Sequence, residues 1–202
     1  MLTELREKTR TQHEHLEQEL DLLRPDLTLP EYVSLLEQML LLYTPLERAV
    51  ADAIPAPWAA RLELEERVKV GWLRADLDTL RPGRAGLAAV QVGPRPDLHG
   101  EAAAWGALYV LEGATLGGQI ICRSLAGRLG LTPQTGLRFY ASYGTQVGPR
   151  WKAFCRALED RAGQEQGERA TAFADAAVRG AQATFAAFEA SAVPAVRGAV
   201  TA

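Results

Sequence analysis

The chain has little that would mark it as a disulfide-stabilised, membrane-spanning or nucleic-acid-binding protein. Among its 202 residues are two cysteines, Cys122 and Cys155, which is too few for a disulfide scaffold and fits a reducing compartment. Its longest apolar run, MLLLY at 39–43, is far too short to cross a bilayer, and the N-terminus has no apolar signal core. A net charge of −3 argues against general nucleic-acid binding, which needs a basic surface. We therefore expect a cytoplasmic protein that binds neither membranes nor nucleic acid.

Strand-type alternation of β-branched residues is also missing, and helical periodicity takes its place. Prolines such as Pro30 and Pro57 lie where helices should begin. Residues 81–100 are rich in Gly and Pro, which predicts an irregular connection. The sequence thus predicts a single all-α domain over residues 1–202, with a loose tail at 193–202. Apolar residues recur at three- and four-residue spacing over 2–23, 31–52, 57–80, 101–130, 149–163 and 166–192.

Two of the three histidines lie in the charged stretch LREKTRTQHEHLEQEL at 5–20. Since each residue of a helix advances by about 100°, His13 falls within roughly 20° of Arg6, beside the apolar face. Arg10 lies in the same stripe, one turn before His13. His15 points about 180° away, among charged and polar neighbours. Of the two, only His13 is therefore placed to reach into a core.

His13 has two interpretations. The commoner one is a partly buried histidine that is satisfied by a hydrogen bond. The other treats His13 as a metal ligand and the two arginines as partners for carboxylates on the same ligand. A ligand with a metal, a broad apolar body and two carboxylates is haem. A di-iron centre needs Glu-x-x-His motifs, and none of His13, His15 and His99 has a Glu three residues before it.

Three glycines interrupt the otherwise helical stretch WGALYVLEGATLGGQIICRSLAGRL at 105–129. In a helix interior a glycine costs about 1 kcal/mol relative to alanine, so Gly113, Gly117 and Gly118 require a reason. One reason is close packing against another helix. The other is bare backbone that lies directly on a flat ligand, with the glycines also letting the helix bend.

The segment KTRTQHEHLE, followed later by YVLEGATLGGQ, resembles the haem oxygenases, and the similarity covers residues 2–190. The similarity is to the bacterial branch, including the forms that supply biliverdin to bacterial phytochromes. The resemblance implies an all-α fold with haem between a proximal and a glycine-bent distal helix. His13 matches the proximal iron ligand of the family. Gly113, Gly117 and Gly118 match the distal-helix glycines over the iron, where the family carries out its chemistry.

Four basic residues match those that contact the haem propionates in the family. Arg6 and Arg10 come from the first helix. Lys152 and Arg156, in PRWKAFCRALE, have the i, i+4 spacing that places them on one helical face. Because these positions are basic in the members that cleave haem at the α position, biliverdin IXα is the expected product.

Ala114 is a departure from the animal haem oxygenases, which carry at this position an aspartate that organises proton delivery. Glu112 is a poor substitute, since two helical steps turn it by about 200° from Ala114. Protons must then travel through waters held by the backbone or by other groups.

The implied reaction is cleavage of haem b, which is both substrate and cofactor, by O2 and reducing equivalents to biliverdin, CO and Fe2+. The chain carries no flavin or nicotinamide fingerprint, so an external ferredoxin- or flavodoxin-like reductant and a bacteriophytochrome acceptor are the implied partners. A non-enzymatic haem carrier or sensor is the alternative, because the distal aspartate is missing. A cysteine nucleophile acting on thiamine-like substrates, as in some helical proteins of similar fold, has no visible partner base. The glutamate-rich run at 63–68 predicts a solvated helix face.

Overall fold

The computed structural model describes residues 1–82 and 98–197, which fold into helices. Within these two ranges no strand occurs, and the all-α prediction is confirmed. Part of the predicted connection at 81–100 lies outside the described residues. The elements are α1 (Leu2–Leu20), α2 (Leu29–Ala53), α3 (Ala56–Leu62), the 3-10 helix η1 (Leu64–Arg67), α4 (Val70–Leu80), α5 (Gly100–Leu129), α6 (Arg138–Ala141), the 3-10 helix η3 (Gly144–Gln146), α7 (Val147–Ala162) and α8 (Glu168–Arg197).

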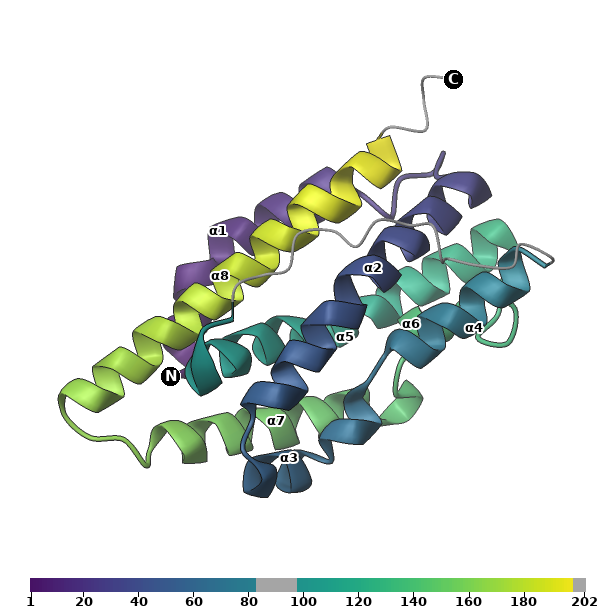
Figure 1. The fold of residues 1–202 in the computed structure, drawn as a ribbon. Helices are drawn as coiled ribbons and strands as arrows, with labels where there is room; N and C mark the ends of the chain where they lie inside the picture. The colour runs from purple at the N-terminus through teal and green to yellow at the C-terminus, as the bar shows by residue number, and fades with distance from the viewer. Residues whose placement is uncertain (83–97, 198–202) are drawn as a thin grey trace.

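The long helix α5 runs through the middle of the molecule (Figure 1). It packs against both α8 and α2, while α1 lies alongside α8. The buried apolar residues of these helices form one continuous core. None of the helices in the described ranges has the length and apolar character that a membrane crossing requires.

The helices α5 and α8 cross in direct backbone contact. A Cβ atom added to Gly106 would lie 1.8 Å from the carbonyl oxygen of Ala177, and one added to Gly180 would lie 2.2 Å from that of Ala103. No side chain fits at such a crossing, which explains why both helices are rich in Gly and Ala there. The phenylalanines Phe185 and Phe188 of α8 are buried.

The C-terminal helix is longer than predicted. α8 continues through Pro194 to Arg197, so residues 193–197 belong to the helix and not to a loose tail. A proline late in a helix removes one backbone hydrogen bond without forcing the helix to end at that point. Residues 198–202 lie outside the described residues.

The single helix predicted over 57–80 is wrong. α3 ends at Leu62, Glu63 adopts a left-handed conformation with φ 50°, and η1 separates it from α4. Arg67 and Lys69 turn inward and are 4% and 2% exposed, so the run at 63–68 is not a fully solvated face. The Glu47 carboxylate of α2 accepts hydrogen bonds from the backbone N–H groups of Lys69 and Val70, at 2.6 and 3.3 Å, and thereby caps α4.

The short helix α6 was not predicted. The buried Asp76 carboxylate of α4 accepts hydrogen bonds from the backbone N–H groups of Arg138 and Phe139, both at 2.8 Å. These bonds satisfy the free N–H groups at the start of α6. They also place Phe139 and Tyr140 in the core beside α5.

Candidate haem-binding site

A cavity of about 520 Å³ lies between α1 and α5, and we call it the α1–α5 cavity. Its volume is within the range of about 300–1,000 Å³ that is usual for cofactor sites. Side chains of α2, α6, α7 and α8 contribute to its mainly apolar wall. The apolar and aromatic lining residues are Leu16, Leu20, Leu22, Met39, Tyr43, Tyr109, Val110, Leu116, Ile121, Phe139, Tyr140, Trp151, Phe185 and Phe188.

His13 lies in the α1 wall of this cavity, with its side chain 56% exposed. The Phe185 ring of α8 contacts the imidazole edge-on, at a centroid distance of 5.9 Å. The Nε2 atom of His13 is 3.6 Å from the Oε1 atom of Glu17 one turn later, which also lines the cavity. The imidazole is therefore held by an aromatic ring on one side and remains accessible from the cavity.

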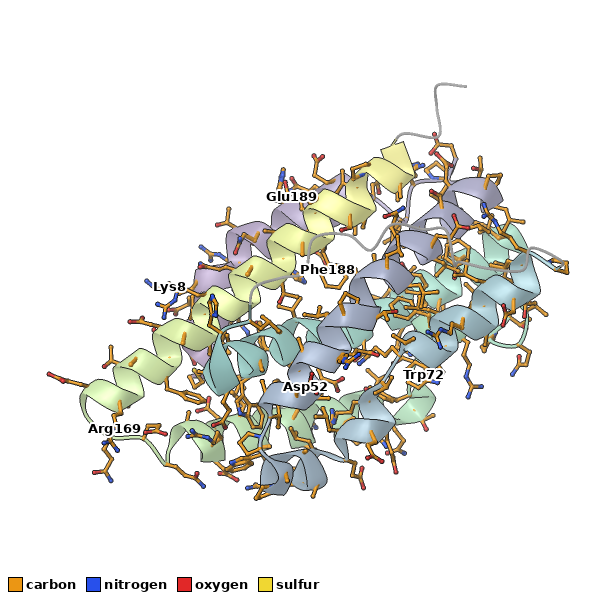
Figure 2. The ribbon with its side chains drawn as sticks, viewed as in Figure 1. Lys8, Asp52, Trp72, Arg169, Phe188 and Glu189 are labelled. Atoms are coloured by element: carbon orange, nitrogen blue, oxygen red, sulfur yellow. The ribbon has the colours of Figure 1, made fainter. Side chains whose placement is uncertain are left out.

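His15 lies outside the cavity lining. Its Nε2 atom is 3.2 Å from the Oε1 atom of Glu189, which projects from α8 (Figure 2). On α8, Glu189 follows Phe188, whose buried ring contacts Tyr43 at 5.6 Å. The two histidines thus face different surroundings, as the helical phase predicted, but the His13 side chain is no more buried than that of His15, which is 50% exposed and contacts α8.

Arg6 and Arg10 belong to the same wall as His13. Arg10 is exposed and its Nε atom is 4.0 Å from the Glu14 carboxylate, a loose surface pair. Arg6 approaches α7: burial raises the pKa of the Cys155 thiol, and the nearby Arg6 guanidinium opposes that rise. Two cations therefore flank the His13 side of the cavity, where they can neutralise carboxylates on a bound ligand.

The predicted glycines all line the opposite wall, on α5, together with Ala114. A Cβ atom on Gly117 would meet no atom within 4 Å, so this position opens directly into the cavity. On Gly113 it would make ordinary contact with the Trp151 ring, at 3.8 Å. On Gly118 it would lie 3.1 Å from the Tyr140 carbonyl oxygen, which is a packing restraint. The packing reason thus holds for Gly118, whereas Gly117 leaves bare backbone facing the cavity, and its contact with a flat ligand stays a prediction.

Lys152 and Arg156 do not belong to the cavity lining. Both lie on α7 with exposed side chains, although the preceding residue, Trp151, does line the cavity. Their contact with a ligand's carboxylates stays a prediction. The structure brings six of the eight predicted site residues to one cavity and leaves this pair on the surface beside it.

Lys69 is a lining residue that the sequence did not reveal. Its Nζ atom donates hydrogen bonds to the Glu112 carboxylate, at 2.7 Å, and to the Arg67 carbonyl oxygen, at 2.9 Å. Glu112 also accepts hydrogen bonds from the Arg67 guanidinium and from the Tyr143 hydroxyl. Burial alone would raise the pKa of Glu112, but the Lys69 and Arg67 cations hold it below its ordinary value. Glu112 is thus not among the lining residues, but its carboxylate binds a lysine that is.

In the two described ranges, no group of three or more His, Cys, Asp or Glu residues gathers into a metal-binding cluster. A di-iron centre therefore has no ligand set in that part of the chain. A histidine that faces an apolar cavity, with cations beside it and bare backbone across from it, suits a flat metal-containing ligand with carboxylates.

A family model described as haem oxygenase matches residues 1–192. The chain belongs to the haem oxygenase family. A haem oxygenase from Xanthomonas campestris is 40% identical over 125 residues, which cover 60% of this chain and 66% of that protein. The chain thus spans slightly less than two thirds of this relative's length.

The fold is also that of a solved haem oxygenase. Haem oxygenase-1 from the cyanobacterium Synechocystis, determined in complex with haem, superposes with a TM-score of 0.71 over 98% of this chain and 94% of that one. At 16% identity this likeness establishes the fold. The haem oxygenase fold predicted from the sequence is confirmed, and both bacterial relatives are consistent with the bacterial branch.

Proposed function

We propose that the chain is a haem oxygenase, which cleaves haem b to biliverdin, CO and Fe2+ with O2 and external reducing equivalents. The observation that carries this proposal is the α1–α5 cavity. It sets the accessible imidazole of His13 across from the bare backbone at Gly117, with Arg6 and Arg10 at its side.

Each part of the wall has a task in the proposed reaction. His13 would hold the iron, and the two arginines would neutralise the propionates. The open backbone at Gly117 would let the ring lie close to α5 without a side chain between them. Bound haem supplies the iron at which O2 is reduced and the ring that is opened, while the protein supplies position and electrostatics.

The experiment is a haem titration followed by reduction in air. Haem is added, then ascorbate or a ferredoxin with its reductase, and the visible spectrum is recorded. Loss of the Soret band, growth of a biliverdin-like band and release of iron support the enzyme. A stable haem spectrum under the same conditions would instead favour the haem carrier or sensor. That alternative is considered because Ala114 stands in place of the distal aspartate.

We also propose biliverdin IXα as the main product, because the propionates are the charged handles on the edge of a nearly symmetric disc. Removing Lys152 and Arg156 together, by K152A/R156A, should let the ring rotate and add other isomers. A charge-assisted contact contributes about 1.5–3 kcal/mol, which is enough to shift orientational populations. Chromatography of the product decides this, with R48A/R169A as a control for lost surface charge. A single unchanged isomer from K152A/R156A would assign the selectivity to packing against α5.

The proposal also includes an external ferredoxin- or flavodoxin-like reductant, a bacteriophytochrome as acceptor and a cytoplasmic location. The two free cysteines support the location. The resemblance to the bacterial branch supports the reductant and the acceptor. Turnover rates with a purified ferredoxin and a purified flavodoxin, each at matched potential, would identify the preferred class of donor.

A further inference from the structure

Lys69 lies in the wall of two cavities. Besides the α1–α5 cavity it lines a second one of about 550 Å³, which we call the α2–η1 cavity because α2, α3, η1 and α5 enclose it. The exposed residues Glu63, Glu65 and Glu66 lie in the wall of the α2–η1 cavity, so this cavity opens to solvent. The buried Lys69 side chain thus lies between a solvent-open cavity and the candidate haem site.

Two buried cations share one buried carboxylate at this place. Arg67 and Lys69 both bind Glu112, and Glu47, whose side chain lies near the Lys69 charge, is the next carboxyl group. Buried charge clusters are costly and are often found at functional sites. If Lys69 gave up a proton, Arg67 and Glu112 would remain as a balanced pair. The ionisable and charged groups that face the Lys69 side are Glu47 of α2, Arg67 of η1, Glu112 of α5, Tyr143 before η3 and Arg150 of α7, which contacts the Tyr143 ring.

Several other polar groups in the wall of the α1–α5 cavity are poorly suited to proton donation. Burial raises the pKa of Tyr43, Tyr109 and Tyr140. The Thr115 hydroxyl already donates to the Glu112 carbonyl oxygen, at 2.6 Å. Arginine does not release its proton in proteins. Ala114, at the position of the distal aspartate, has no polar group to offer.

Glu47 supplies a second titratable group on the solvent side. It lines the α2–η1 cavity and binds the backbone N–H of Lys69. Burial raises the pKa of Glu47, so its carboxyl keeps a proton at higher pH than a surface glutamate would. It is therefore suited to passing protons inward from solvent.

We propose that Lys69 is the proton donor at the α5 side of the α1–α5 cavity and is resupplied from the α2–η1 cavity past Glu47. This rests on the proposed function, since reduction of O2 consumes protons. The Lys69 ammonium releases one proton into the α1–α5 cavity and becomes a neutral amine. One proton from solvent then passes by way of Glu47 to that amine, which restores the charge, and no electrons move through the cluster.

Two substitutions of Lys69 separate proton donation from charge. K69M removes both the charge and the proton, whereas K69R keeps the charge on a group that does not release its proton. K8M, at an exposed lysine of α1 outside the cavity lining, is the matched control. The first measurement is the pH at which the ferric haem complex changes to its alkaline spectrum. The second is the rate of haem conversion.

The expected results differ between the two variants. K69M should raise the pH of the spectral transition by about one unit, since a nearby ammonium favours the more negative alkaline form. K69R should leave the transition where it is. Both variants should convert haem about 100-fold more slowly, the usual loss when an acid–base group is removed, and K8M should match the wild type. Wild-type turnover by K69R, or an unshifted transition in K69M, would overturn the proposal.

E47Q tests the route of resupply and keeps the proposal falsifiable if K69M fails to fold. Glutamine retains an acceptor for the N-terminus of α4 but does not titrate. Conversion should fall about tenfold with haem affinity and the spectral transition unchanged, a loss smaller than that of the donor itself. Wild-type turnover by E47Q would overturn the route past Glu47. If the wild-type protein itself does not convert haem, the proposed function fails, whereas the transition in K69M still reports whether the ammonium reaches the haem.

Discussion

His13 and His15 are two residues apart on α1, yet only His13 faces the α1–α5 cavity. H13A should therefore weaken haem binding and abolish conversion. H15A removes one half-exposed pair with Glu189, which contributes no more than about 1 kcal/mol to stability and nothing to the cavity. Titration with haem, followed at the Soret band, compares the two variants. A Soret band that survives in H13A and disappears in H15A would show that the wrong histidine has been assigned to the iron.

Gly117 and Gly118 are adjacent but differ in what surrounds them. G117L should lower haem affinity while leaving the fold intact, because its side chain enters open cavity space. G118L should also destabilise the fold by about 1–3 kcal/mol, since the Tyr140 carbonyl oxygen lies 3.1 Å from its Cβ position. Circular dichroism with urea unfolding, beside haem titration, separates the effects. Equal losses of stability in both variants would mean that Gly117 too is a packing residue.

The sequence predicted which residues line the site wherever helical periodicity alone determines the face of the helix on which a side chain lies. One helical phase was enough to place His13, Arg6 and Arg10 on a common wall. Lys69 could not be found in this way, because its inward direction depends on Glu112 of α5, far away along the chain.

At the scale of the helix, the crossing of α5 and α8 requires glycine. G106A would place a Cβ atom 1.8 Å from the Ala177 carbonyl oxygen, so the two helices must separate, at a cost of about 1–3 kcal/mol. G127A is the matched control on the same helix, where an added Cβ meets nothing within 4 Å. It should stabilise the protein by up to about 1 kcal/mol, because alanine favours helix. Urea unfolding of both variants measures this, and similar midpoints would contradict the crossing geometry.

Helix content was predictable because long amphipathic stretches have a clear period, whereas the break between α3 and α4 was not. Periodic apolar positions continue across residues 57–80, so the pattern there is that of one helix. The chain turns inward after Glu63 because Glu47 caps α4 and the Arg67 side chain binds the Leu62 carbonyl oxygen, at 2.6 Å. Periodicity does not report the tertiary contact between α2 and α4. The short α6 escaped prediction for the same reason, since Asp76 of α4 holds its first turn.

For the molecule as a whole, the Glu112 cluster predicts a pH-dependent stability. The pKa of Glu112 is lowered by folding, so its contribution is present above the unfolded value of 4.5 and is lost as pH falls through the folded value. E112Q leaves two buried cations without their carboxylate and should cost about 3–5 kcal/mol at neutral pH. The difference from wild type should shrink as pH falls below 4.5.

Urea unfolding of E112Q and wild type at several pH values tests this, with E65Q as the control for an exposed carboxylate. Glu47 and Asp76 have raised pKa values and act in the opposite direction, but they are common to all three proteins and cancel in the comparison. A difference that stays constant from neutral pH to pH 3 would show that folding does not lower the pKa of Glu112.

Because of the way α1 packs, a bound ligand would contribute to the stability of the fold. α1 rests mainly on α8, and the cavity occupies the space between it and α5. A ligand that touches both helices completes the hydrophobic core at that place, so binding and folding are thermodynamically linked. At a free concentration 100 times its dissociation constant, such a ligand adds about 2.7 kcal/mol to the free energy of unfolding. In the proposed reaction, release of the iron would remove the link to His13, and that added stability would decrease. Loosening of α1 would then be coupled to departure of the product, so the helix that holds the substrate would also control product release.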